Sequence, residues 1–219
     1  MREILYPDVG PAVPRRGNAF SRWLGRRLLN LIGWRMVGEF PNERKCILLG
    51  APHTSNFDVV LALGGMLDLG INLNVMVKDN AFKGPWAGLF RWFGALPIDR
   101  SKSTGMVEQT VETFKRADHL LLVIMGEGTR KAPEKWKTGF YHIAAGAQIP
   151  LVPCVLRYDL KVLEFKPPFH PSGDFAKDWP LLLAQFKDGV PRYPERLSKP
   201  LADLQGKPWR PWRGVATRP

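Results

Sequence analysis

The sequence predicts a single α/β domain in which helices flank a mainly parallel central sheet. Three apolar runs, at residues 46–52, 94–98 and 120–125, have the composition of strands, and helical patterns separate them. The run at 120–125 is apolar throughout, as expected of a central strand that is covered on both faces. Polar residues follow each run, and ligands bind at strand carboxyl ends in open α/β sheets. We therefore expect these polar residues to converge at one edge of the sheet.

The chain is strongly basic. Its 219 residues suggest one domain, and an apolar content of 45% is enough for a substantial core. The formal net charge of +12 indicates an anionic partner. That partner is a nucleic acid, an acidic lipid surface or a phosphorylated substrate or carrier, and charge alone does not choose among them.

The first structured element is expected to be an amphipathic helix within residues 18–36, after an irregular N-terminus at 1–17. Five apolar residues recur at helical spacing with arginines between them: Phe20, Trp23, Leu24, Leu28 and Leu31. Such a helix suits a membrane interface, but the same pattern describes a surface helix packed on the domain. The N-terminus has no apolar signal-peptide core, and no apolar stretch reaches the roughly 18 to 20 residues of a transmembrane helix. We therefore expect no transmembrane span.

The main domain is expected to span residues 37–189, followed by a Pro-rich basic tail at 190–219 that is largely irregular. Further strands are expected at 73–77, 150–156 and 162–165, the last of them at a sheet edge. Helices are expected to follow His53 to Asp58, to begin near Lys83 with Trp86, Phe90 and Phe93 on one face, and to occupy 103–116, 138–146 and 179–187.

His53 and Asp58 form the first candidate catalytic pair. Side chains five apart on one helix point roughly 140° away from each other, so the two meet only if His53 lies in the preceding loop. With Ser55 as N-cap, Asp58 falls in the first helical turn and can orient the imidazole as a general base. The alternative is a capping box from Ser55 to Asp58 beside an ordinary loop histidine.

Cys46 and Cys154 lie in apolar runs and are expected to be small buried residues in a reducing compartment. Neither cysteine has metal-ligand neighbours, so no metal site is expected. No Gly-x-Ser-x-Gly motif is present, and neither cysteine has a base beside it in sequence. We therefore expect no covalent intermediate on a serine or cysteine nucleophile.

Four stretches occur in the order and spacing of the glycerolipid acyltransferase family: His53 to Asp58, Gly94 to Arg100, Glu127 to Arg130 and Ile149 to Pro153. The sequence resembles the lysophosphatidic acid (1-acylglycerol-3-phosphate) acyltransferase group of that family. The resemblance covers about Val37 to Lys166 and implies a glycerol-3-phosphate acyltransferase-like α/β fold. Residues 37–189 would then be the acyltransferase domain.

The resemblance also implies roles for particular residues. His53 would be the base, Asp58 its orienter, and Arg100 a ligand of the acceptor's phosphate. The acceptor site would be completed by Glu127, Gly128, Thr129 and Arg130. The fourth stretch, Ile149 to Pro153, has a less defined role that includes acyl-chain packing. Gly126 departs from the family, which usually has proline before Glu-Gly-Thr-Arg, and glycine suggests a looser turn.

The function implied is transfer of a fatty acyl group from a thioester donor, acyl-CoA or acyl carrier protein, to a lysophospholipid hydroxyl in phospholipid biosynthesis. The acceptor implied is 1-acylglycerol-3-phosphate, with no cofactor beyond the acyl donor as co-substrate. We expect a peripheral protein on an anionic membrane surface, at the cytoplasmic face, and no nucleic-acid partner. The alternative is a noncatalytic lipid- or nucleic-acid-binding protein that uses the same positive surface.

Overall fold

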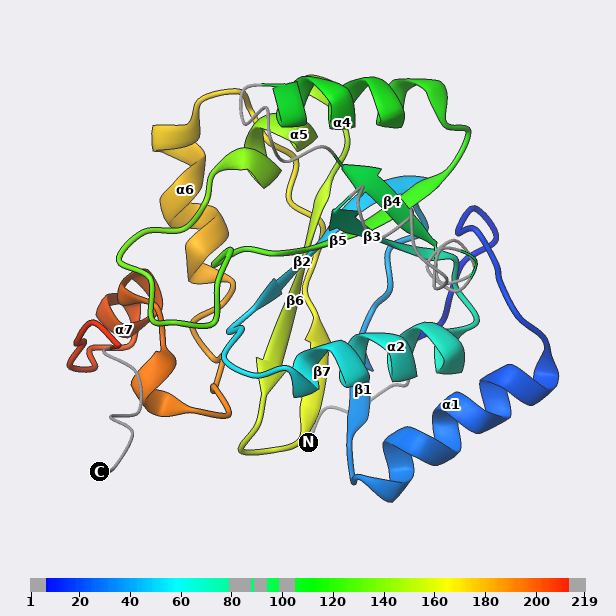
Figure 1. Ribbon diagram of the computed structural model, residues 1–219, viewed down its shortest axis with the longest axis horizontal. Coiled ribbons are helices and arrows are strands. Elements are labelled where there is room, and N and C mark those ends of the chain that lie inside the picture. The colour runs from blue at the N-terminus through cyan, green and yellow to red at the C-terminus, as the bar shows by residue number, and fades with distance from the viewer. Residues whose placement is uncertain (1–6, 79–87, 89–93, 99–104, 213–219) are drawn as a thin grey trace.

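A seven-stranded sheet forms the centre of the computed structural model, which describes residues 7–78, 88, 94–98 and 105–212 (Figure 1). Its strand order is β1-β7-β6-β2-β5-β3-β4. The strands are β1 (Arg35–Gly38), β2 (Lys45–Ala51), β3 (Leu73–Lys78), β4 (Ala95–Ile98), β5 (Leu120–Met125), β6 (Leu151–Arg157) and β7 (Val162–Phe165). All neighbouring pairs are parallel except β6 and β7, which run antiparallel. The predicted α/β fold with a mainly parallel sheet is therefore confirmed.

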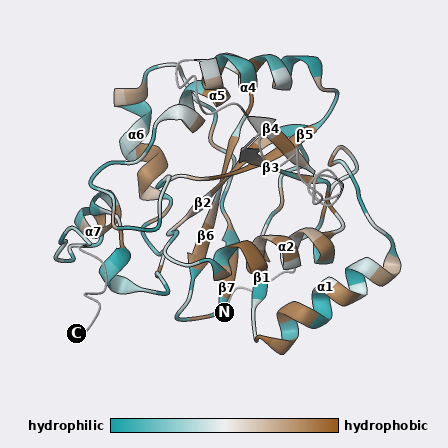
Figure 2. Cartoon of the chain, in the orientation of Figure 1, coloured by the Kyte–Doolittle hydropathy of each residue, from teal (hydrophilic) through white to brown (hydrophobic). Residues whose placement is uncertain are grey.

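Helices cover both faces of the sheet (Figure 1). The helices are α1 (Ala19–Leu31), α2 (Phe57–Leu69), α4 (Gly105–Arg116), α5 (Gly139–Ala147), α6 (Phe175–Ala184) and α7 (Lys199–Leu204). One buried cluster joins α1 and α2 to the sheet, and the other joins α4, α5, α6 and α7 to its opposite face. Alternate residues of β2 enter the two clusters, Ile47 on one face and Leu48 on the other, as a doubly covered strand requires. Figure 2 shows the hydrophobic character of the central strands and of α2.

Helix α1 packs on α2 and also leaves apolar side chains in solvent. Gly25 and Leu29 are buried, and a Cβ at Gly25 would lie 2.5 Å from the backbone nitrogen of Asp68, so the two helices approach closely. The residues left exposed are Phe20, Trp23, Leu24, Leu28 and Leu31. No helix in the described part of the chain is long and apolar enough to cross a membrane.

Several predicted boundaries were wrong. Helix α1 ends at Leu31, and the expected helical segment 18–36 includes the start of β1, a strand that the sequence reading missed. Because β1 pairs with β7, the strand at 162–165 is not at the sheet edge. Helix α6 begins at Phe175, four residues before the predicted start, with Pro180 inside it. The predicted aromatic helix near Lys83, with Trp86, Phe90 and Phe93, lies outside the described residues.

The tail was expected to be largely irregular, and most of residues 190–212 lie outside helices and strands. This part of the chain holds a 3-10 turn (Pro194–Arg196) and α7, and it buries Leu197, Ser198 and Leu201. Buried apolar residues at α7 give the tail a place in the core that its proline content does not suggest.

Candidate active site

His53 and Asp58 are held together at the carboxyl end of β2. His53 lies in the loop after β2, and Asp58 is the second residue of α2. His53 Nδ1 lies 2.7 Å from Asp58 Oδ2, and the Asp58 side chain is only 1% exposed. With the carboxylate accepting the Nδ1 proton, Nε2 is the basic nitrogen, and it has no hydrogen-bond partner among the described residues. The geometry expected of the pair is present, and its role as a base stays a prediction.

Ser55 fixes the start of α2 around this pair. The Ser55 hydroxyl accepts the backbone N–H of Phe57 at 3.1 Å, and the Ser55 N–H donates to Asp58 Oδ2 at 3.2 Å. Helix α2 begins at Phe57 with Asn56 in the cap position, one residue later than predicted, and Ser55 supplies the capping hydrogen bond. The Asp58 carboxylate thus makes both the contact expected of a capping box, with the Ser55 N–H, and the contact expected of the pair, with His53.

Tyr158 is a third partner that the sequence reading missed. It follows β6, and its hydroxyl donates to Asp58 Oδ1. The Trp34 ring packs edge-on against the Tyr158 ring, with 4.8 Å between centroids. Burial and the neighbouring carboxylate raise the pKa of Tyr158, so its hydroxyl remains a donor at neutral pH. No sequence motif marks this contact, which joins residues 100 positions apart.

Glu127 lies behind His53. It follows β5, is 1% exposed, and accepts the backbone N–H of His53 on Oε1 at 2.5 Å. Burial raises the pKa of Glu127 to about 8, although the His53 N–H and the nearby Ser198 act in the opposite direction. The contact joins the loop after β2 to the loop after β5. A direct contact of Glu127 with the acceptor stays a prediction that this buried position does not favour.

The Trp136 side chain accounts for the glycine before Glu127. A Cβ on Gly126 would lie 2.4 Å from a ring carbon of Trp136, so no residue with a side chain fits unless the indole moves. The indole Nε1 donates to the hydroxyl of buried Ser198 at 2.9 Å. The turn is therefore packed tightly under the indole, in contrast to the looser backbone that a missing proline suggests.

A cavity of about 640 Å³ opens beside His53 and Asp58. Gly128, Thr129 and Arg130 line it, and the left-handed φ of 66° at Gly128 turns the chain toward it after Glu127. Most of the remaining lining is apolar: Val59, Ala62, Leu63, Met66, Leu73, Val75, Met76, Val123, Ile124 and Met125. The structure thus brings five of the seven predicted site residues to one cavity. Arg100 lies outside the described residues, and Glu127 lies behind the cavity.

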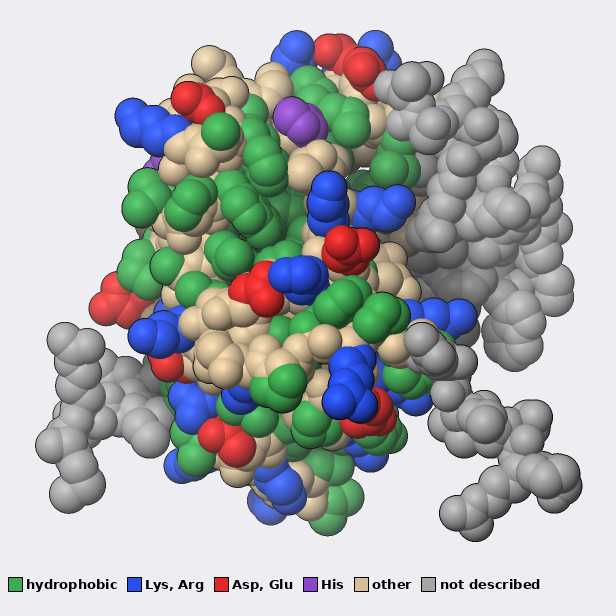
Figure 3. All heavy atoms as spheres, turned by 90° about the vertical axis from the view of Figure 1, so that its left-hand side faces the viewer, with side chains coloured by type: hydrophobic (Ala, Val, Ile, Leu, Met, Phe, Trp, Pro, Cys, Tyr) green, Lys and Arg blue, Asp and Glu red, His purple; other side chains and the backbone are tan. Residues whose placement is uncertain are grey.

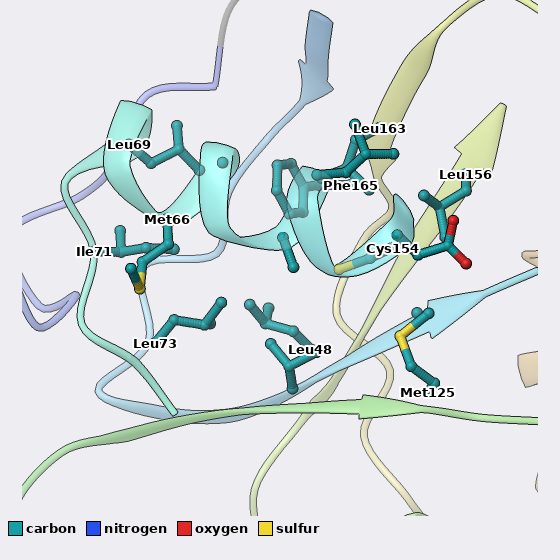
Figure 4. A pocket seen from close by; sticks show the side chains of 16 residues that line it. Leu48, Met66, Leu69, Ile71, Leu73, Met125, Cys154, Leu156, Leu163 and Phe165 are labelled. Atoms are coloured by element: carbon teal, nitrogen blue, oxygen red, sulfur yellow. The ribbon is translucent and has the colours of Figure 1, made fainter. Parts of the chain in front are cut away.

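A smaller apolar pocket of about 60 Å³ continues from this cavity between α2 and the sheet (Figure 4). Asp58, Ala62 and Met66 line both spaces. Figure 4 shows the side chains around the inner part: Leu48, Leu69, Ile71, Leu73, Cys154, Leu156, Leu163 and Phe165. Residues 149–153 are absent from the described lining of either space, and Leu151 to Pro153 belong to buried strand β6.

The described part of the chain offers neither a cluster of metal ligands nor an activated cysteine. There, no group of three or more His, Cys, Asp or Glu residues could hold a metal ion. Cys46 and Cys154 are free and buried, as predicted. Burial raises the pKa of both thiols, so they are protonated and poorly nucleophilic at neutral pH.

Residues 35–157, more than half of the chain, match the model of the family described as Acyltransferase. The 1-acyl-sn-glycerol-3-phosphate acyltransferase of Cocos nucifera is 28% identical over 150 residues, which cover 65% of this chain and 47% of the relative. The protein of the same name from Haemophilus influenzae is 26% identical over 161 residues, covering 69% of this chain and 65% of the relative. The chain thus spans about half to two thirds of the length of these curated relatives.

The crystal structure of the 1-acyl-sn-glycerophosphate acyltransferase from Thermotoga maritima has a similar fold, with a TM-score of 0.54. The match covers 77% of this chain and 76% of the other at 16% sequence identity. The fold, the matched residues and the pairing of His53 with Asp58 agree with one another. The chain belongs to the Acyltransferase family.

Proposed function

We propose that this chain transfers a fatty acyl group from a thioester donor to the hydroxyl of a lysophospholipid, with 1-acylglycerol-3-phosphate as the acceptor. The observation that carries the proposal is the His53–Asp58 pair at a cavity that combines apolar walls with Arg130. Two curated relatives are named 1-acyl-sn-glycerol-3-phosphate acyltransferases, which supports this choice of acceptor.

His53 acts as the general base in this mechanism. Its Nε2 takes the proton of the acceptor hydroxyl as the oxygen attacks the thioester carbonyl. The carbon–sulfur bond then breaks, and the thiol leaves with a proton returned by the imidazolium. Asp58 stabilises the positive imidazole in between, and the transfer is direct because both cysteines are buried and protonated.

Arg130 binds the acceptor's phosphate, with Arg100 as the second expected ligand. The Arg130 side chain is exposed at the cavity and has no ion pair with a carboxylate among the described residues. A planar guanidinium forms paired, charge-assisted hydrogen bonds with phosphate oxygens. The donor's hydrocarbon chain lies along the apolar wall and reaches the pocket between α2 and the sheet, where burial in an apolar site favours it.

We place the protein on an anionic membrane surface through α1. Trp23 and Leu31 are 52% and 85% exposed, and arginines lie between the apolar positions. Such a helix lies in the interface, with apolar side chains among the acyl chains and basic ones at anionic headgroups. Lipid substrates would then reach the cavity from the surface to which the protein is bound.

The experiment offers the purified protein 1-acylglycerol-3-phosphate with a long-chain acyl-CoA or acyl carrier protein donor, and measures the diacyl product by mass. We expect product with the unmodified protein and a loss of at least about a thousandfold in His53→Ala. His119→Ala is the matched control, because His119 is exposed at the opposite end of β5 from Glu127. Equal product from His53→Ala would refute the assignment of the base. Lipid binding without turnover of any lysolipid would favour the noncatalytic alternative.

A further inference from the structure

The segment from Val190 to Trp212 forms part of the active-site structure, although the family match ends at residue 157. The Tyr193 N–H donates to the hydroxyl of Thr54, and Arg196 donates from Nη1 to the Thr54 carbonyl, both at 3.3 Å. Thr54 follows His53 directly and is fully buried. The segment therefore supports the catalytic loop from the side.

The same segment brings Arg196 to the loop after β5 and Arg192 to the start of α2. The Arg196 carbonyl accepts the N–H of Ala132 at 3.1 Å, which places Arg196 beside Lys131. Lys131 Nζ lies 5.6 Å from the centroid of the Trp212 ring, and the Arg196 guanidinium lies 5.0 Å from the same ring. Arg192 lies 4.8 Å from the ring of Phe57, the first residue of α2. We call Lys131, Arg192 and Arg196 the basic rim.

The basic rim has no carboxylate partner within the described part of the chain, where none of its three side chains forms an ion pair. The Nε atom of Arg196 is buried and has no hydrogen-bond partner among those residues. Aromatic rings hold the cations in place, so they are positioned before any anion arrives.

The rim borders the cavity. Lys131 lines the cavity that contains His53, and Arg192 contacts Phe57, which directly precedes Asp58. Arg192 is also close enough to Tyr158 to lower the pKa of its hydroxyl. Figure 3 looks onto the face that lies at the left of Figure 1, where Lys and Arg side chains are interspersed with hydrophobic ones.

The acceptor of the proposed reaction has one phosphate, for which Arg130 and Arg100 are the expected ligands. The rim supplies three more cations: Lys131, which directly follows Arg130, and Arg192 and Arg196 from the segment after Val190. An acyl thioester carried on a phosphorylated pantetheine arm has its own phosphates, at the far end from the reacting carbonyl. Clustered guanidinium and ammonium groups suit such phosphates.

We propose that the basic rim, Lys131, Arg192 and Arg196, is the binding site for the phosphate groups of a phosphopantetheine-linked acyl donor. The inference rests on the proposed acyl transfer for its choice of ligand. Two carriers share this chemistry: free coenzyme A, and an acyl carrier protein with its phosphopantetheine arm. The rim binds the donor, and Arg130 with the dyad serves the acceptor.

The first test measures binding without turnover. Isothermal titration compares free coenzyme A on the unmodified protein, on the double variant Lys131→Ala, Arg192→Ala, and on Lys187→Ala. Lys187 is the matched control, because it is exposed and lines a different pocket, which none of the rim residues line. Arg196 is left intact because its contact with Thr54 would confound the result. Circular dichroism melting confirms that the double variant is folded.

We expect the double variant to bind coenzyme A at least about tenfold more weakly than the unmodified protein and Lys187→Ala. Its affinity for 1-acylglycerol-3-phosphate should stay within about twofold. The affinity for coenzyme A should also fall with added salt, because the rim is at the surface. The proposal would be overturned by equal affinity for coenzyme A in all three proteins. It would also be overturned if the double variant lost as much affinity for the acceptor as for coenzyme A.

The second test distinguishes the two carriers by steady-state kinetics with acyl-CoA and with acyl carrier protein donors. A rise in the donor KM of the double variant, with the acceptor KM unchanged, supports the rim and shows which carrier uses it. If turnover occurs and neither donor KM changes, the rim is not the donor site. If coenzyme A binding depends on the rim but no turnover occurs with either donor, the rim remains a binding site for the phosphates and the proposed acyl transfer is refuted.

Discussion

The Tyr158 hydroxyl donates a hydrogen bond to the Asp58 oxygen that His53 does not contact, so the Asp58 carboxylate is held from both sides. Because Asp58 is almost fully buried, each of its hydrogen bonds helps to fix the direction of its carboxylate. The position of the imidazole therefore depends on a residue that lies beyond the end of a different strand, β6.

Replacement of Tyr158 by phenylalanine should lower kcat roughly tenfold and leave both KM values nearly unchanged. The ring and its packing on Trp34 would remain, and the hydrogen bond to Asp58 would be lost. Steady-state kinetics checks the prediction. Tyr141→Phe is a matched control, because it removes a buried Tyr–Asp hydrogen bond to Asp178 without touching the cavity. Equal kcat values for the two variants would show that Tyr158 does not act through Asp58.

Glu127→Gln should change how stability depends on pH. The pKa of Glu127 is about 8 in the folded protein and its ordinary value is 4.5. Between these values the folded state holds a proton that the unfolded state releases, so this group's contribution to stability is complete below pH 4.5 and is lost as pH rises through 8. From this group alone, the free energy of unfolding changes by up to about 1.4 kcal/mol per pH unit. Denaturant unfolding from pH 5 to 9 should show that the free energy of unfolding falls less steeply with pH in the variant than in the unmodified protein. Identical slopes for the two proteins would contradict the burial argument.

Gly126→Ala should destabilise the protein by roughly 1–3 kcal/mol, because the new methyl group would overlap the Trp136 ring. Thermal unfolding measures the effect, and acyl transfer should fall as well because Glu127 is the next residue. Gly139→Ala is the control, since a Cβ there would meet only Val107, at 3.9 Å. A Gly126→Ala protein as stable as Gly139→Ala would mean that the indole moves aside without cost.

The double variant Trp23→Ser, Leu31→Ser should bind anionic vesicles at least about tenfold more weakly while its melting temperature stays nearly constant. Both side chains are exposed, and their removal from the interface eliminates apolar area that the lipid would bury. Co-sedimentation with vesicles measures binding. Leu181→Ser on α6 provides the control, as this leucine is 60% exposed. Unchanged sedimentation of the double variant would exclude α1 as the contact.

Ala62→Phe should shift donor preference toward shorter acyl chains. Ala62 lines both the cavity and the pocket between α2 and the sheet, so a larger ring would narrow the passage between them. Competition among donors of different chain length, followed by mass, gives the preference. Val60→Phe places the same ring at an exposed position of α2 and should leave the preference unaltered. An unchanged donor preference in Ala62→Phe would mean that the donor's acyl chain does not pass between the cavity and the pocket.

The sequence predicted the parts of the site that depend on local pattern. Strand β2, the loop with His53 and the first turn of α2 follow from an apolar run and a capping residue, both of which are local. The links made by Tyr158 and Ser198 join distant segments and leave no periodic or spacing signal. The short strand β1 was missed because four residues carry too little pattern, and the tail's prolines concealed the buried face of α7.

The contacts of Tyr193 and Arg196 with Thr54 span 139 and 142 residues of chain. During synthesis the loop with His53 leaves the ribosome long before the segment that supports it. Contacts so distant in sequence also form late and slowly in folding. The candidate site should therefore be completed as one of the last events in the maturation of a newly made molecule, after most of the sheet has assembled.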